Sequence, residues 1–167
     1  MIVRELAIDP GKTSGYALFE VLTMTKKPKL KISGCVPGNA VTDFRNMGAF
    51  IHNSNADVLL IETQFFHPKR KAKNLMQLLE NRFVWEFFAR QQSCTVGRID
   101  PAEWQSYWKL KSNLEIKNKT KRSKDFKLQI VEKAKKVTRR KYMEENEADA
   151  ILMGFYWLNA IKDSPHA

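Results

Sequence analysis

Two apolar runs that each end in an acidic residue constrain the fold more than any other feature of this 167-residue chain. Residues 3–9 read VRELAID and end at Asp9, and residues 57–62 read DVLLIE and end at Glu62. The continuous apolar run before Glu62 is typical of strands that are buried on both faces, as in parallel sheets, and residues 3–9 also read as a buried strand. If the two strands lie side by side and parallel, both carboxylates emerge at one edge of the sheet, where open α/β sheets hold their ligands.

The rest of the hydrophobic pattern predicts an α/β fold with a mixed sheet and helices on both faces. Strands over residues 15–22 and 28–36 follow the first strand at short spacing, which favours an antiparallel meander. The other expected elements are a helix over 42–52 with Thr42 as its N-cap, a helix over 72–90, a strand over 95–100, a short helix over 103–108, and helices over 125–137 and 147–162. Because repeats and Pro/Gly/Ser linkers are absent from the sequence, we expect one domain over residues 1–167.

The helix expected over residues 72–90 has two apolar stripes on different sides. The first stripe consists of Met76, Leu79, Phe83 and Phe87, and the second of Leu78, Trp85 and Phe88. A helix that is apolar on two sides is buried on two sides. In a small domain the second side often meets another subunit, so we expect the second stripe to form a dimer surface. On this hypothesis Trp85→Glu gives a folded monomer.

The charge of the chain favours a polyanionic partner, of which nucleic acid is the commonest. The net charge is +11, from 29 Lys and Arg against 18 Asp and Glu. Two segments concentrate the basic residues, one over residues 69–73, directly after residues 65–68, and one over residues 109–124. The candidate DNA-contacting residues in these segments are Lys69, Arg70, Lys71, Lys73, Lys117, Lys119, Lys121 and Arg122. We interpret the second segment as a loop that contacts phosphates, from which Lys119 or Lys121 approaches the reacting phosphate; the alternative is a solvated face.

Several classes of protein do not fit this sequence. No apolar run approaches the roughly 18–20 residues that a membrane helix needs. The N-terminal residues contain Glu5 and lack the long apolar segment of a signal peptide. Cys35 and Cys94 are far apart and form no CxxC pair, so they do not make a zinc cluster by themselves. Two small buried thiols are typical of a reducing compartment, and we expect a cytoplasmic protein.

A third acid, Asp149, falls at the start of the last expected helix, from which it can reach the same sheet edge. Any one such acid is also readily explained as a turn or cap residue. Converging carboxylates repel one another unless a cation neutralises them, and hard oxygen ligands select Mg²⁺ or Mn²⁺. Two such ions about 3.5–4 Å apart can activate a water and stabilise the leaving oxygen of a phosphodiester. The sequence therefore predicts that Asp9, Glu62 and Asp149 are catalytic metal ligands in a basic, DNA-binding protein.

Three segments resemble the motifs of RuvC-type Holliday junction resolvases. Residues 6–17 (LAIDPGKTSGYA) resemble the first motif, residues 59–65 (LLIETQF) the second and residues 147–152 (EADAIL) the last. Their order and separation extend the resemblance over almost the whole chain, and its small size is similar to that of the phage-encoded members. The resemblance implies a ribonuclease H-like fold with a five-stranded sheet, a homodimer, two Mg²⁺ or Mn²⁺ ions per site and paired nicking of four-way DNA junctions.

The resemblance also implies roles for individual residues. The family usually has a fourth metal ligand, Asp or His, three residues before the last aspartate, where this chain has Asn146. The amide oxygen of Asn146 can coordinate a hard cation without contributing charge, and Glu145 and Glu147 are the alternatives. Phe65, three residues after Glu62, has the spacing of an aromatic residue that stacks on a base near the crossover; the alternative is that Phe65 and Phe66 both pack in the core.

Another aromatic group allows two interpretations. It consists of Trp104, Tyr107 and Trp108, which either stack on bases or pack in the core or a dimer interface.

Two other functions remain open from the sequence. One is a ribonuclease H-type nuclease that acts on RNA–DNA hybrids, and the other is a protein that binds branched DNA without cutting it. The IDPG motif, the two-sided helix and Phe65 favour a junction resolvase over the hybrid nuclease. Three intact carboxylates argue against the non-cleaving protein, which would gain nothing from them.

Overall fold

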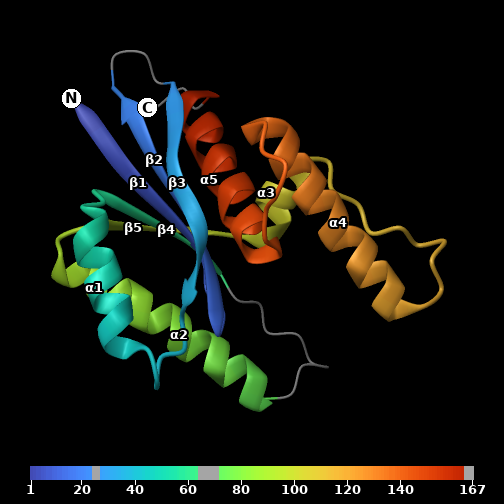
Figure 1. The fold of residues 1–167 in the computed structure, drawn as a ribbon, viewed down its shortest axis with the longest axis horizontal. Helices are drawn as coiled ribbons and strands as arrows, with labels where there is room; N and C mark the ends of the chain where they lie inside the picture. The colour runs from blue at the N-terminus through green and yellow to red at the C-terminus, as the bar shows by residue number, and fades with distance from the viewer. Residues whose placement is uncertain (24–26, 64–71, 164–167) are drawn as a thin grey trace.

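A computed structural model of the chain describes residues 1–23, 27–63 and 72–163, and its centre is a five-stranded mixed sheet in the order β3-β2-β1-β4-β5. The strands are β1 (Ile2–Asp9), β2 (Thr13–Leu22), β3 (Pro28–Pro37), β4 (Val58–Glu62) and β5 (Thr95–Ile99). The first three pair antiparallel, whereas β1, β4 and β5 run parallel (Figure 1). The predicted mixed sheet is confirmed, with strand boundaries shifted by one or two residues.

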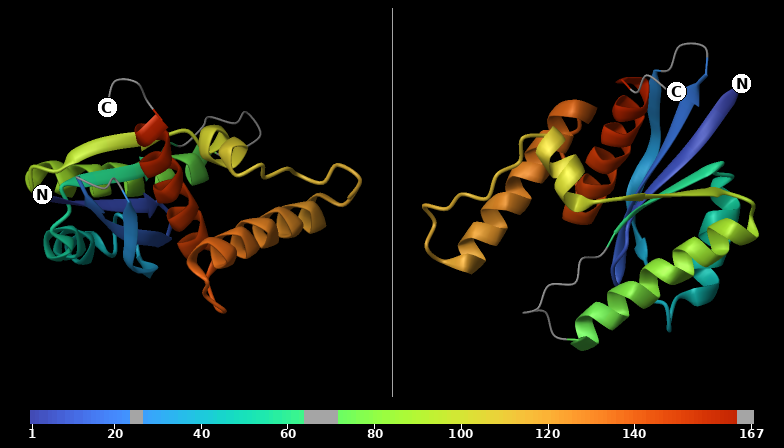
Figure 2. Two further views of the ribbon diagram at one scale, coloured as in Figure 1. Left: turned by 90° about the horizontal axis from the view of Figure 1, so that it is seen from above. Right: turned by 180° about the vertical axis from the view of Figure 1, so that it is seen from behind.

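Helices cover both faces of this sheet, as predicted (Figures 1 and 2). They are α1 (Phe44–Ser54), α2 (Ala72–Gln91), α3 (Pro101–Tyr107), α4 (Lys119–Thr138) and α5 (Glu145–Asp163). Helices α1 and α2 pack on one face, while α5 lies across β1, β2 and β3 on the other and carries α4 on its outer side. Two buried clusters result, one on each face of the sheet.

The packing on β1 explains why the three residues before Asp9 are all apolar. Leu6 and Ile8 belong to the cluster under α1 and α2, whereas Ala7 belongs to the cluster under α5. The α5 side uses small residues because the helix lies close to the sheet. At Gly15 of β2 an added Cβ would lie 1.7 Å from the backbone oxygen of Asn146, so only glycine allows this contact with the first turn of α5.

Four helix starts differ from the prediction: α1 begins two residues later, α3 and α5 begin two residues earlier, and α4 begins six residues earlier. Helix α4 begins at Lys119 instead of residue 125, and the side chain of Asn118 caps it by accepting from the backbone N–H groups of Thr120 and Lys121. The expected phosphate-contacting loop is therefore partly helical, because its basic residues are good helix formers although the apolar stripe starts later. Helix α1 begins at Phe44, so Thr42 is not its N-cap.

The predicted dimer surface on α2 was also wrong. Trp85 is 0% exposed, packs in the core under α1 and α2, and donates a hydrogen bond from Nε1 to Ser14 Oγ at 3.2 Å. Phe88 is packed against the same core. A glutamate at position 85 would place a charge in this core, so Trp85→Glu cannot serve as a folded monomer. The large apolar side chains that are exposed on α2 belong to the other stripe: Met76 at 55%, Phe83 at 68% and Phe87 at 39%.

The expectation that both cysteines are buried holds for only one of them. Cys94 is buried, with its Sγ 2.8 Å from the backbone oxygen of Ala56, whereas Cys35 on β3 is only partly buried, and both are free thiols.

Within the described ranges, no helix is long and apolar enough to cross a membrane.

Candidate functional site

The three predicted carboxylates meet at one cavity. Asp9 and Glu62 are the last residues of the parallel neighbours β1 and β4, and the pairing of Ile8 with Ile61 sets them side by side. Asp149 approaches from the N-terminal part of α5. All three, together with Asn146, line a cavity of about 450 Å³ at the carboxyl edge of the sheet. The convergence expected from the strand ends is therefore present.

The electrostatics of this cavity disfavour three ionised acids. Burial, followed by the charges of Glu62 and Asp149, raises the pKa of Asp9 well above its ordinary value. Burial and the charge of Glu62 raise the pKa of Asp149 to about 7. Each shift means that the ionised form is poorly stabilised by the protein alone. A cation in the cavity would offset this repulsion.

The donor chemistry of the cavity fits a hard divalent cation, although its side chains are not set as a finished ligand sphere. Across residues 1–23, 27–63 and 72–163, no three His, Cys, Asp or Glu side chains are grouped tightly enough to hold one metal ion. Glu62 Oε1 accepts a hydrogen bond from Trp104 Nε1 at 3.0 Å. Carboxylate and amide oxygens are nevertheless the ligands that Mg²⁺ and Mn²⁺ prefer. Binding would therefore require these side chains to close around the ion.

The aromatic residues of α3 and its C-terminal end are mostly packing residues. Trp104 is 1% exposed and contacts Glu62, so it is not available to stack on a base. Trp108 is partly buried and donates from Nε1 to the backbone oxygen of Leu152 at 2.8 Å. Only Tyr107 is substantially exposed. The interpretation as core packing is thus confirmed for the two tryptophans.

Lys127 on α4 is a cavity residue that the sequence reasoning missed. Its side chain lines the acidic cavity and forms an ion pair with Glu145. The hydrogen bond to Glu145, and to a smaller extent the charges of Asp149 and Asp9, raise the pKa of Lys127. The basic run considered from the sequence ended at residue 124. A helical wheel through Phe126 and Ile130 places Lys127 beside the buried stripe and could have identified it.

The predicted DNA-contacting residues are only partly described. Phe65, Lys69, Arg70 and Lys71 lie outside the described residues, as does the side chain of Lys73. The remaining candidates are Lys117, Lys119, Lys121 and Arg122. Lys117 precedes α4, and the other three lie in its first turns.

Two of these residues line a cavity beside the acidic one. Lys119 and Arg122 line a space of about 400 Å³ next to the acidic cavity. The guanidinium of Arg122 also donates to the backbone oxygen of Ile116, which holds the preceding loop against α4.

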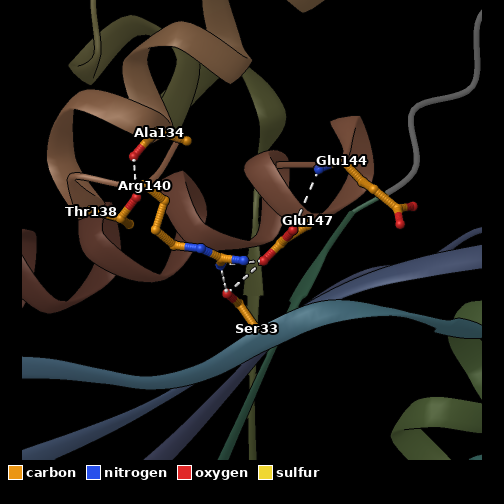
Figure 3. Close-up of polar contacts among 6 residues, drawn as sticks. All are labelled: Ser33, Ala134, Thr138, Arg140, Glu144 and Glu147. Carbon is orange, nitrogen blue, oxygen red and sulfur yellow. Dashed lines mark hydrogen bonds and ion pairs between the residues drawn. The ribbon is translucent and has the colours of Figure 1, made fainter. Parts of the chain in front are cut away.

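The first turn of α5 is tied to three different elements. Glu145 pairs with Lys127 of α4, and Asn146 Nδ2 donates to the backbone oxygen of Thr13 on β2 at 2.8 Å. Glu147 is not among the residues that line the acidic cavity, and it belongs to a separate network (Figure 3). Because Asn146 lines the cavity and Glu147 does not, the structure favours Asn146 over Glu147 as the candidate fourth ligand.

The network around Glu147 joins the edge strand β3 to the α4–α5 connection. Glu147 Oε1 accepts from Ser33 Oγ at 2.7 Å and from Arg140, and Arg140 Nη1 also donates to Ser33 Oγ at 2.7 Å (Figure 3). Glu147 is buried, so Arg140 supplies the charge that keeps its carboxylate stable. The network fixes the turn that precedes Asp149.

Arg140→Met is expected to destabilise the fold by about 1–3 kcal/mol, because it leaves a buried carboxylate without its cation, in a pair that is partly open to solvent. The free energy of unfolding in urea measures the effect. Arg140→Lys should restore part of it, and Lys141→Met, at an exposed neighbour, is the matched control. Equal stability of Arg140→Met and wild type would show that the network does not hold the turn.

Comparisons with known proteins identify the fold. No protein-family model and no curated protein sequence matches the chain. Among solved structures, RuvC of Thermus thermophilus in complex with a Holliday junction substrate matches with a TM-score of 0.67 and 14% identity, covering 96% of each chain. The fowlpox virus resolvase in complex with Holliday junction DNA matches at 0.59 and 18%, covering 96% of this chain and 99% of that one. The yeast mitochondrial Holliday junction resolvase matches at 0.55 and 15%, covering 93% and 78%. The predicted ribonuclease H-like architecture is thereby confirmed, and the chain shares its fold with these resolvases.

Proposed function

We propose that this protein is a metal-dependent endonuclease that nicks four-way DNA junctions by phosphodiester hydrolysis. The observation that carries the proposal is the convergence of Asp9, Glu62 and Asp149 on one cavity in a chain with a net charge of +11. An acidic cavity within a basic protein is suited to holding a metal ion against a bound polyanion. The shared fold with resolvases solved on junction DNA supports the choice of substrate.

The metal ligands in this proposal are Asp9, Glu62 and Asp149, with the amide oxygen of Asn146 as an uncharged fourth. A pair of Mg²⁺ or Mn²⁺ ions supplies Lewis acid stabilisation of the phosphodiester and a readily ionised water. Lys127 neutralises a phosphate oxygen at the mouth of the same cavity. To make that contact, the ammonium group of Lys127 leaves its ion pair with Glu145 and pairs with the phosphate instead.

The basic residues near the cavity hold the DNA backbone. Lys117, Lys119, Lys121 and Arg122 lie at the start of α4, next to the site. Contacts of this kind release counterions from the DNA, so binding should weaken steeply as salt concentration rises. Phe65, Lys69, Arg70, Lys71 and Lys73 stay predictions from the sequence.

One assay tests this function against its alternatives. The protein is incubated with a labelled four-way junction, a flap, a linear duplex and an RNA–DNA hybrid, each with Mg²⁺, with Mn²⁺ and with a chelator. We expect cleavage of the junction, only when metal is present. Faster cutting of the hybrid would favour a ribonuclease H-type enzyme, and binding of the junction without cutting in either metal would favour a non-cleaving protein.

We also propose that the active form is a homodimer. Resolution of a four-way junction needs two nicks on opposite strands, and a two-fold dimer supplies two related sites. The exposed stripe of α2 is the candidate surface, and it consists of Met76, Glu80, Phe83, Phe87 and Arg90. Exposed Phe44 of α1 lies beside it, with its ring centroid 6.5 Å from that of Phe87. An apolar patch of this kind is usually covered in a soluble protein.

The order of residues along this stripe suits antiparallel packing of two α2 helices. Phe83 and Phe87 lie at equal distances on either side of position 85, and so do Glu80 and Arg90. A two-fold axis at that position would set Phe83 against the partner's Phe87 and Glu80 against the partner's Arg90. The apolar centre and the opposite charges at its two ends are therefore self-complementary.

Phe83→Glu is expected to convert the dimer into a monomer of 19.4 kDa, because it places a charge at the centre of the apolar stripe. Each phenylalanine buried in the interface contributes about 1.5–3 kcal/mol to dimer stability, and the dimer contains two copies of each. Sedimentation at micromolar concentration measures the mass. On a plasmid with an extruded cruciform, the variant should give nicked circles where the wild type gives linear DNA.

The matched control is Leu128→Glu, which places the same charge at an exposed apolar residue of a different helix, α4. It should leave the sedimentation of the protein unchanged. A wild-type protein that sediments as a monomer would refute the dimer.

A further inference from the structure

A groove leads outward from the acidic cavity, first between α3 and α4 and then along α3 and the residues that follow it. The acidic cavity adjoins the space of about 400 Å³ described above, which in turn adjoins a third space of about 480 Å³. Gln105 lines all three spaces. Ser123 and Phe126 are shared by the first two, and Leu110 by the outer two. We call this continuous depression the α3–α4 groove.

The charge of the groove changes sign along its length. Its inner end holds the three carboxylates and Lys127. The side chains of described residues that line the two outer spaces include Lys119 and Arg122 in one and Lys109 and Lys111 in the other, with no Asp or Glu among them. Helix α4, which is 20 residues long, begins at Lys119, so its positive N-terminal end also lies at this part of the groove. The outer groove is therefore suited to a chain of negative charges that extends away from the acidic site.

Three polar side chains are regularly spaced along the side of α4 that faces the groove. Lys119, Ser123 and Lys127 are four residues apart, which places them on one side of the helix with a rise of about 6 Å between neighbours. Lys127 lines the acidic cavity, Ser123 lines the junction of the first two spaces, and Lys119 lines the second. This step is similar to the separation of consecutive phosphates along a nucleic-acid strand.

We propose that the α3–α4 groove holds the cut DNA strand on one side of the cleavage point, with Lys127, Ser123 and Lys119 contacting three consecutive phosphates. Lys127 contacts the phosphate that is cut, Ser123 the next and Lys119 the third. Gln105 of α3 contacts the same stretch of strand from the opposite wall, where its amide can donate to or accept from a sugar or base. This inference rests on the proposed function and specifies how that site binds its substrate.

The test removes the charge of one phosphate at a time and measures whether the loss of binding depends on a particular side chain. The cut is first mapped with the wild-type protein in Mn²⁺. Junctions are then made with one neutral methylphosphonate at the second or third phosphate, counted from the cut on either side. Binding is measured for the full-length protein in an Asp9→Asn background, which keeps the junction intact, with and without Lys119→Ala.

We expect the neutral third linkage on one side of the cut to weaken binding severalfold when Lys119 is present. In Lys119→Ala the same linkage should have no effect, and the slope of log affinity against log salt should fall by about one. Ser123→Ala should abolish the effect of the neutral second linkage but leave the salt slope unchanged, because serine carries no charge. Lys136→Ala, at an exposed position in the last turn of α4, should leave the pattern of sensitive linkages unchanged.

The groove assignment is overturned if Lys119→Ala keeps the sensitivity of the parent protein to every neutral linkage. It is also overturned if no single linkage affects binding. Either result leaves the proposed nuclease standing when the mapping step shows metal-dependent cutting. A wild-type protein that cuts no junction in Mg²⁺ or Mn²⁺ overturns the proposed function itself.

Discussion

Asp9→Asn is expected to lower the rate of junction cleavage by about a thousandfold or more, while the junction is bound as tightly as before or more tightly. The variant removes one charged ligand from a site whose metal stabilises the transition state by several kcal/mol, and each 1.4 kcal/mol is a factor of ten in rate. Binding should be preserved because the cavity repels the phosphate less when one carboxylate is neutral. Single-turnover cleavage and gel-shift binding, measured side by side, separate the two effects.

Glu62→Gln and Asp149→Asn should behave in the same way, because their carboxylates line the same cavity. Asp125→Asn is the matched control. Asp125 is on α4, and its carboxylate accepts a hydrogen bond from Gln129 at 2.8 Å, a contact that an asparagine can keep. The assignment fails if Asp9→Asn cuts junctions at a rate close to that of the wild type.

The position of the acids could be predicted from the sequence because it follows from strand geometry alone. The stretches that directly precede the two acids, Leu6–Ile8 in β1 and Val58–Ile61 in β4, are entirely apolar, so Asp9 and Glu62 mark the strand ends. Parallel strands that pair in register bring their ends together. The place of Asp149 needed one more fact, the contact of Gly15 with the first turn of α5, which is visible only in the folded chain.

Helix α2 shows where a hydrophobic pattern stops being informative. Both of its stripes contain large apolar residues, so periodicity identifies two sides without telling which one faces the sheet. The answer depends on tertiary contacts, such as the hydrogen bond from Trp85 to Ser14. Lys127 was missed for a related reason, since a lysine at the margin of a buried stripe is usually solvated and only the facing acids distinguish it.

One buried acid has no place in the proposed chemistry and is expected to weaken the fold. Glu5 lies in the middle of the sheet, where it pairs with Phe19 of β2 and Val58 of β4, and it is 3% exposed. Within the described part of the chain its Oε1 is buried without a hydrogen-bond partner. Burial raises the pKa of this carboxyl from 4.5 to about 8, so the folded protein keeps a proton that the unfolded chain has lost at neutral pH.

This raised pKa makes stability fall as pH rises. Below pH 4.5 the carboxyl is protonated in both the folded and unfolded states and contributes no pH dependence. Between that value and about 8 the unfolded state binds fewer protons, so the free energy of unfolding decreases, and above about 8 the decrease levels off. At pH 7 the accumulated loss is on the order of 3 kcal/mol.

Glu5→Gln, which cannot ionise, should therefore be more stable than the wild type by on the order of 3 kcal/mol at pH 7 and should differ little from it near pH 4.5. Urea unfolding of both proteins at several pH values measures the difference. The raised pKa values of Asp9 and Asp149 act in both proteins and cancel in this comparison. Glu115→Gln, at an exposed position, should show no such gain. If the advantage of Glu5→Gln does not grow with pH, then Glu5 is ionised in the folded protein and has found a partner for its charge.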